Sequence, residues 1–126
     1  VEHVAAVVTR FPADRRADLW SGVGLAAAYA GAVGERELSL LRRLAGDYNP
    51  NLAQGAAFAA KARERAGSPA VHTDCACRVF CGSAAGIAAV ATDEALKELR
   101  GDADLPDYEI WRRRIRDRYS SEAAIP

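Results

Sequence analysis

The sequence lacks methionine entirely and carries no net charge. Its 126 residues include 17 basic and 17 acidic side chains, and two of the basic ones, Lys61 and Lys97, are lysines. Zero net charge removes the usual electrostatic basis for binding nucleic acid or an anionic membrane, so we expect neither as a partner. A chain that starts at Val1 without a start residue indicates a fragment or a trimmed or processed product, with upstream sequence missing.

Long apolar runs and a distributed set of cysteines are absent too. No run approaches the roughly 18 apolar residues of a membrane-spanning helix, and no segment resembles a signal peptide. The three cysteines are crowded into residues 75–81, unlike the even, distributed set of a secreted disulfide framework. These absences favour a soluble cytoplasmic protein. The scarcity of lysine and the abundance of alanine are typical of a high-GC bacterium such as an actinomycete.

Helical periodicity runs through nearly the whole chain, and no run of alternating β-branched residues indicates a strand. We therefore predict an all-α fold of about six or seven short helices. The length favours one domain over residues 1–119, followed by a frayed tail at 120–126. The predicted helices are 2–10, 13–30, 35–45, 50–66, 69–91 as one helix or two broken near Gly82, 92–99, and 106–119.

Glycine, proline and capping residues set the predicted boundaries. Gly46 is expected to stop the third helix, and Pro50 to open the fourth, with the preceding Asn49 outside it. Gly67 and Ser68 are expected to end the fourth helix, and Ser68 with Pro69 to cap the next one. Thr92, followed by two acidic residues, is expected to cap a short helix that ends at glycine 101.

Three segments share a run of small residues around a central glycine, at 19–31, 52–67 and 79–91. A glycine inside a helix costs about 1 kcal/mol relative to alanine. We therefore predict that Gly22, Gly55 and Gly82 lie at close helix–helix contacts. The glycines recur at intervals near the length of a two-helix repeat, which favours an irregular array of helical hairpins, either an orthogonal bundle or tetratricopeptide-like.

Four soft metal ligands lie within ten residues: His72, Cys75, Cys77 and Cys81. On one helix, at about 100° per residue, His72 and Cys75 share one face while Cys77 and Cys81 share another. One zinc ion cannot collect all four, so we predict no metal site and no cofactor, with Cys77 and Cys81 in the core. A thiolate–imidazolium pair of Cys75 and His72 remains the catalytic alternative.

Aromatic side chains are the best candidates for an apolar binding site, although core packing explains such residues equally well. Five arginines between residues 112 and 118 are interpreted as a solvated helix face, with docking to an acidic partner as the alternative. The scattered aspartates fit helix capping. The candidate ligand-binding residues are Trp20, Tyr29, Phe58, His72, Cys75 and Trp111, with Tyr48 as a further aromatic.

Five segments also carry a family resemblance. They are FPADRRADLWSGVGLAAAYAG (11–31), LAQGAAFAAKARERAG (52–67), HTDCACRVFCG (72–82), TDEALKELR (92–100) and PDYEIWRRRIR (106–116). Together they resemble the C-terminal part of an actinobacterial family of unknown function found in enediyne antibiotic gene clusters. The family's members have a further region before the position of Val1. The resemblance implies an accessory role in making a polyene or enediyne intermediate, and it transfers no catalytic residue.

Two classes of function remain open at this point. A binding module would hold an apolar polyene or enediyne intermediate, or a partner biosynthetic protein, in a groove between helices. An enzyme would act on the same intermediate through the segment His72–Cys81. Self-resistance by sequestering the finished antibiotic is a variant of the binding class. The favoured expectation is the binding module, with the missing N-terminal region and a second copy of the chain as further partners.

Overall fold

The computed structural model describes residues 1–99 and 105–123, with the helical backbone alone for 121–123, and every regular element in this part of the chain is a helix. The predicted all-α fold is confirmed. The described elements are α1 (Glu2–Thr9), α2 (Ala13–Ala30), α3 (Glu35–Ala45), the 3-10 turn η1 (Gly46–Tyr48), α4 (Asn49–Ala66), α5 (Val71–Cys81), α6 (Ala85–Leu96) and α7 (Asp107–Ala123).

Segment 69–91 forms two helices, α5 and α6, which meet at an angle of 64°. Gly82 produces this break, because it has the left-handed conformation (φ 69°, ψ 15°) that ends α5 and that glycine adopts without strain. The helix α7 continues to Ala123, four residues past its predicted end near Tyr119. No single described helix has the length and apolarity needed to cross a membrane, although α5 and α6 together, as a bent pair, satisfy that test.

Three predicted helix starts are wrong. Asn49 is the first residue of α4, with helical dihedral angles (φ −55°, ψ −40°), because η1 leads directly into the helix. Ser68 does not cap α5, which begins at Val71. The backbone N–H of Ser68 instead donates to the Arg63 carbonyl at 3.0 Å, so Ser68 belongs to the motif that closes α4.

Thr92 is the third exception, since it lies inside α6 and caps nothing. Its side chain is fully buried, and its hydroxyl donates to the Ala89 carbonyl one turn earlier, at 2.7 Å. Burial against the neighbouring helices lets α6 continue past it to Leu96. The glycine expected to end that helix, at 101, lies outside the described residues.

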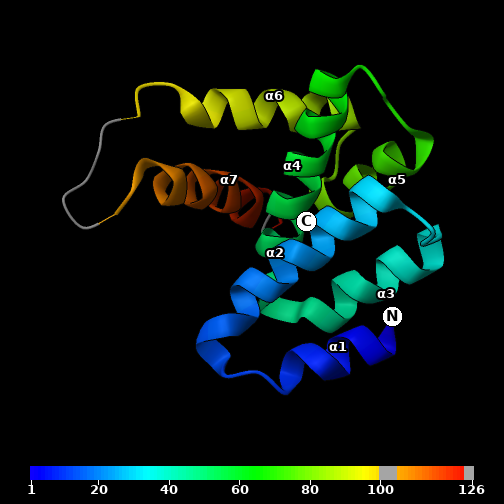
Figure 1. The fold of residues 1–126 in the computed structure, drawn as a ribbon. Coiled ribbons are helices and arrows are strands. Elements are labelled where there is room, and N and C mark those ends of the chain that lie inside the picture. Colours follow the sequence, from blue (N-terminus) through cyan, green and yellow to red (C-terminus); the bar gives the residue numbers. More distant parts are fainter. Residues whose placement is uncertain (100–104, 124–126) are drawn as a thin grey trace.

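The core is organised around α4, which contacts α2, α3, α5, α6 and α7. Figure 1 shows α4 in green at the centre, with α6 and α7 extending to one side and α1 and α3 lying together away from them. The most extensive contact joins α4 to α2, which is not its neighbour in sequence. Nine residues of α4 are buried, most of them small, so surrounding helices approach its backbone closely.

Glycine makes this close approach possible between α2 and α4. A side chain at Gly55 would collide with the Ser21 carbonyl oxygen and lie 2.6 Å from the backbone nitrogen of Leu25. The contact predicted for Gly55 is therefore confirmed. The prediction is wrong for Gly22, which has open space around it; the second close contact is made by Gly24, against the backbone of Leu52. It is wrong for Gly82 also, which is a helix terminus in open space.

Candidate functional site

A cleft of about 690 Å³ lies between the end of α4, the connection at 67–70, and the first turns of α5 and α6. Its volume falls within the roughly 300–1,000 Å³ typical of small-molecule sites. Five of its eleven lining residues are alanine or glycine: Ala60, Ala70, Ala85, Gly86 and Ala89. Because none of them projects a large side chain, the space between the helices stays open and its surface is mainly apolar.

The corner between α5 and α6, beside this cleft, is fixed by Asp74. Its carboxylate accepts hydrogen bonds from the Ala85 backbone N–H at 2.9 Å and from Arg78 Nε at 2.8 Å. Asp74 thus supplies, from α5, the cap that the residue preceding α6 does not provide. The Ala85 hydrogen bond, then the one from Arg78, lowers the pKa of Asp74 below its ordinary value of 3.8.

Replacing Asp74 with asparagine is expected to destabilise the protein slightly at neutral pH, by about 1 kcal/mol or less because the side chain is well exposed. A carboxyl group whose pKa is lowered by folding contributes stability above its unfolded pKa and loses it as the pH falls through the folded value. Thermal melting should therefore show a gap between wild type and Asp74→Asn at pH 7 that closes below 3.8. A gap that stayed constant into acid would contradict this account.

A second polar corner joins α2, α4 and α5 at the edge of the cleft. The Tyr29 carbonyl oxygen, in the last turn of α2, accepts a hydrogen bond from Arg63 Nη2 at 2.6 Å. His72 Nε2 lies 2.8 Å from the same oxygen, and since a carbonyl only accepts, this nitrogen carries the proton. The Arg63 guanidinium lies 4.4 Å above the centre of the Tyr29 ring. These contacts hold the C-terminal turn of α2 against α4 and α5.

The two cysteines predicted for the core are confirmed there. Cys77 is fully buried with its Sγ 3.6 Å from the Ala56 carbonyl oxygen, and Cys81 Sγ lies 3.3 Å from that of Ala53. Cys75 is half-buried, and no hydrogen bond joins it to His72, whose ring faces Tyr29 instead. Within the described ranges, no three histidine, cysteine or acidic side chains form a group able to hold a metal ion.

Phe58 and Trp111 join α7 to the central helix. Their ring centres lie 4.8 Å apart, and Tyr108 meets Trp111 edge to face at 6.0 Å. The indole N–H of Trp111 donates to the Thr92 carbonyl oxygen at 2.8 Å, which adds α6 to the same contact. These side chains pack three helices together.

The remaining aromatic candidate, Trp20, lies elsewhere. It is 4% exposed and adjoins a smaller hollow of about 360 Å³ that Tyr48 also lines, between α1, α2 and the end of α3. The six candidate residues therefore do not form one site. Trp20 lies beside the smaller hollow, and Cys75 is half-buried on α5. The other four form two pairs, Tyr29 with His72 at the end of α2 and Phe58 stacked on Trp111. None of the six lines the larger cleft.

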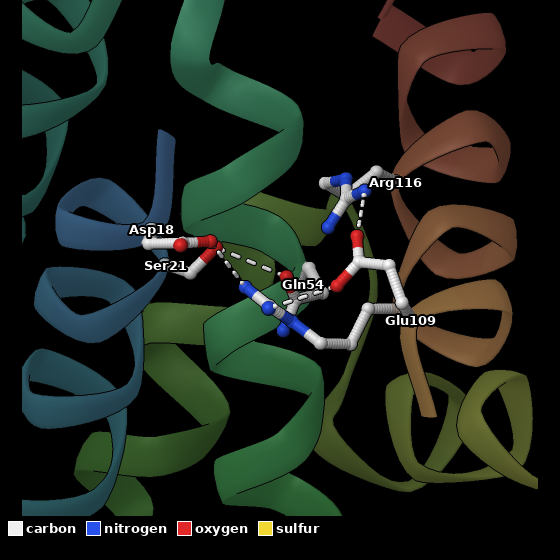
Figure 2. A network of polar contacts seen from close by, with 6 residues as sticks. Asp18, Ser21, Gln54, Glu109 and Arg116 are labelled. Atoms are coloured by element: carbon white, nitrogen blue, oxygen red, sulfur yellow. Dashed lines mark hydrogen bonds and ion pairs between the residues drawn. The ribbon is translucent and has the colours of Figure 1, made fainter. Parts of the chain in front are cut away.

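Ion pairs cover part of the arginine face of α7, contrary to the predicted solvated face, and Arg118 pairs with Glu94 of α6 at 2.6 Å. Arg112 pairs with Asp18 of α2 at 2.9 Å and with Glu109 at 3.2 Å, and Arg116 pairs with Glu109 at 2.9 Å. Figure 2 shows this network between α2, α4 and α7, next to the buried hydrogen bond from the Ser21 hydroxyl to Gln54 Oε1. The network fixes α7 in place and leaves these two guanidinium groups largely covered.

Sequence reasoning missed the residues that line the cleft. The small-residue runs marked α4 and α6 as close-packing helices, but a run of alanines gives no sign of which face meets a neighbour and which borders a cavity. Arg63, in the last turn of α4, fits the preference for cations at helix C-termini, which explains it without any tertiary partner. Its partner Tyr29 lies on another helix.

The fold and the cleft define a small all-α protein with a mainly apolar site between helices. The chain belongs to a family described as "Protein of unknown function (DUF1702)", whose model matches residues 1–119. Searches of curated proteins and of solved structures give no match.

Proposed function

We propose that this domain is a binding module whose α4–α5–α6 cleft holds an elongated apolar intermediate. The cleft carries the proposal, because it combines a volume of about 690 Å³ with a mainly apolar wall in which five of eleven lining residues are alanine or glycine. Removing an apolar molecule from water contributes about 25 cal/mol per Å² of buried surface, with no need for a reactive side chain. The ligand's length and apolarity, rather than its functional groups, then determine most of its affinity.

The biosynthetic context comes from the sequence resemblance. We propose that the module serves an actinobacterial pathway to an enediyne antibiotic, in the cytoplasm, where an iterative polyketide synthase makes long conjugated chains. Such chains are apolar, extended and easily oxidised. A protein that encloses one between helices shields it from water and keeps it extended, which requires binding and positioning alone. The contacts of His72 favour this role over catalysis. Its ring hydrogen-bonds to the Tyr29 carbonyl oxygen instead of to Cys75.

A fluorescent linear polyene, diphenylhexatriene, provides a direct test. Its emission rises when it enters an apolar site, so titration with the protein measures affinity. Gly86 lines the cleft and has open space around it, so leucine at this position fills the cleft without colliding with other described atoms at its Cβ. Gly86→Leu is expected to weaken binding at least tenfold, about 1.4 kcal/mol.

Gly22→Leu is the matched control, because Gly22 is also a helical glycine with open space around it but belongs to α2, outside the cleft. Both variants gain helix propensity and should melt at or above the wild-type temperature. Gly22→Leu should bind the probe as wild type does. Equal affinity of wild type and Gly86→Leu, or equal losses in the two variants, would overturn the proposed function.

A further inference from the structure

The charged groups on the cleft wall differ in their partners. Two acidic residues line it, and each contacts a cation: Glu64 pairs with Lys61 at 2.9 Å, which Asp93 also contacts at 2.8 Å, and Asp74 pairs with Arg78 at 2.8 Å. Arg63 lines the same wall and has no carboxylate partner among the described residues. Arg63 is therefore the cation of this wall that no described carboxylate contacts.

The hydrogen bonds of Arg63 reinforce this point. Its guanidinium donates to two neutral backbone oxygens, those of Tyr29 at 2.6 Å and Ser68 at 3.3 Å, and its Nε is enclosed without any acceptor. A carbonyl oxygen carries only a partial charge, so these bonds orient the group without pairing it with a carboxylate. The Tyr29 ring beneath it and the closing turn of α4 fix its position. A positioned guanidinium with unused N–H groups is suited to binding an anion.

The rest of the wall restricts which anion fits. A free inorganic anion would gain nothing from the alanine and glycine surface, whereas an apolar chain with an anionic end uses both parts of the cleft. The planar fork of N–H donors in a guanidinium matches the two oxygens of a carboxylate. In a partly enclosed site the effective dielectric is lower than in water, which strengthens this pairing.

We propose that the cleft binds a linear apolar chain that ends in a carboxylate, with the carboxylate against Arg63 and the chain along the α6 wall. This inference rests on the proposed function and adds the chemical class of the ligand's end group. It assigns Arg63 the role of selecting that group. Chain length and apolarity then provide affinity, and the charge pair provides selection and direction.

Three compounds with the same alkyl chain test the proposal on the wild-type protein: decanoate, decanol and decylamine, each used to displace diphenylhexatriene at pH 7. Decanoate is expected to displace the probe at a concentration at least about tenfold lower than decanol, as a hydrogen-bonded charge pair implies. Decylamine, which is cationic at this pH, should be weaker than decanol. Because this series uses the unaltered protein, it tests the preference for a carboxylate even if a variant fails to fold.

Substitution then locates the selecting group. Arg63→Gln should abolish the advantage of decanoate and leave decanol unchanged, while Arg63→Lys should keep part of it. Arg65→Gln is the matched control, because it removes an equal charge from an exposed position of the same helix, outside the cleft wall. Circular-dichroism melting checks that each variant folds. Equal losses in Arg63→Gln and Arg65→Gln would indicate a general field effect and overturn the assignment.

The two proposals fail in different ways. If decanol displaces the probe and decanoate has no advantage, the carboxylate preference is wrong and the apolar binding module stands. If neither the probe nor decanol binds, the proposed function fails and this inference fails with it. A preference of wild type for decylamine would overturn the inference as well, because it would place an unpaired anion at the cleft.

Discussion

Gly55→Leu is expected to leave little folded protein at ambient temperature. The new Cβ would meet the Ser21 carbonyl oxygen and the Leu25 nitrogen, which are backbone atoms of α2 and cannot move aside by changing rotamer. The two helices would have to separate along the most extensive contact of the fold. Overpacking in a core typically costs about 1–3 kcal/mol. Because a whole leucine side chain would meet backbone atoms, the destabilisation should exceed that range. It should remove much of the roughly 5–15 kcal/mol by which a folded domain is stable.

Urea denaturation followed by circular dichroism measures this effect, with Gly22→Leu as the control. Gly22 lies one turn of α2 away from Leu25, in open space, so the same substitution there should retain the wild-type midpoint or raise it. Gly55→Ala should be intermediate, since its single methyl group meets the same backbone atoms. A wild-type melting temperature for Gly55→Leu would show that α2 and α4 can separate without cost and would contradict the close-contact interpretation.

Trp111→Ala is expected to lower the free energy of unfolding by about 3 kcal/mol, the lower end of the range for removing a large aromatic side chain, because Trp111 is only partly buried. The substitution removes the stack on Phe58 of α4 and the hydrogen bond to the Thr92 carbonyl oxygen of α6, so α7 loses one contact with each of these helices. Its main remaining core contacts would come from Ile115 and Tyr119, both buried.

Trp111→Phe separates these contributions, because it keeps an aromatic ring against Phe58 and loses the indole N–H. It should cost about 1 kcal/mol, the usual net value of one hydrogen bond, plus a small packing loss. Hydrogen exchange locates the effect: amides of α7 should exchange faster in Trp111→Ala while those of α4 stay protected. Uniformly faster exchange in every helix would mean that Trp111 stabilises the whole fold rather than the attachment of α7.

The sequence by itself determined the features that depend on neighbours along the chain. Helical periodicity without strand patterns predicted an all-α fold, Gly46 marked a helix end, and the burial of Cys77 and Cys81 followed from their shared helical face. Where a predicted helix boundary was wrong, the cause lies in neighbouring residues. Ser68 was interpreted both as an end signal for one helix and as a cap for the next, and its N–H serves the first of these by closing α4 through the Arg63 carbonyl. A capping residue between two helices can serve either one, and the sequence does not distinguish them.

Only the tertiary structure decided which residues form the site. Gly24, rather than Gly22, meets α4, because a shift of two residues turns a helix position to nearly the opposite face and no neighbour is visible in the sequence. Arg63 became a candidate because it contacts Tyr29 and because no carboxylate of the described residues pairs with it, and both properties arise only when the helices are brought together in space. The cleft exists because small residues of α4 and α6 leave room where the two helices diverge near the α5 corner. A cavity is a gap between surfaces, so its position depends on how helices pack and not on the propensity of any one of them.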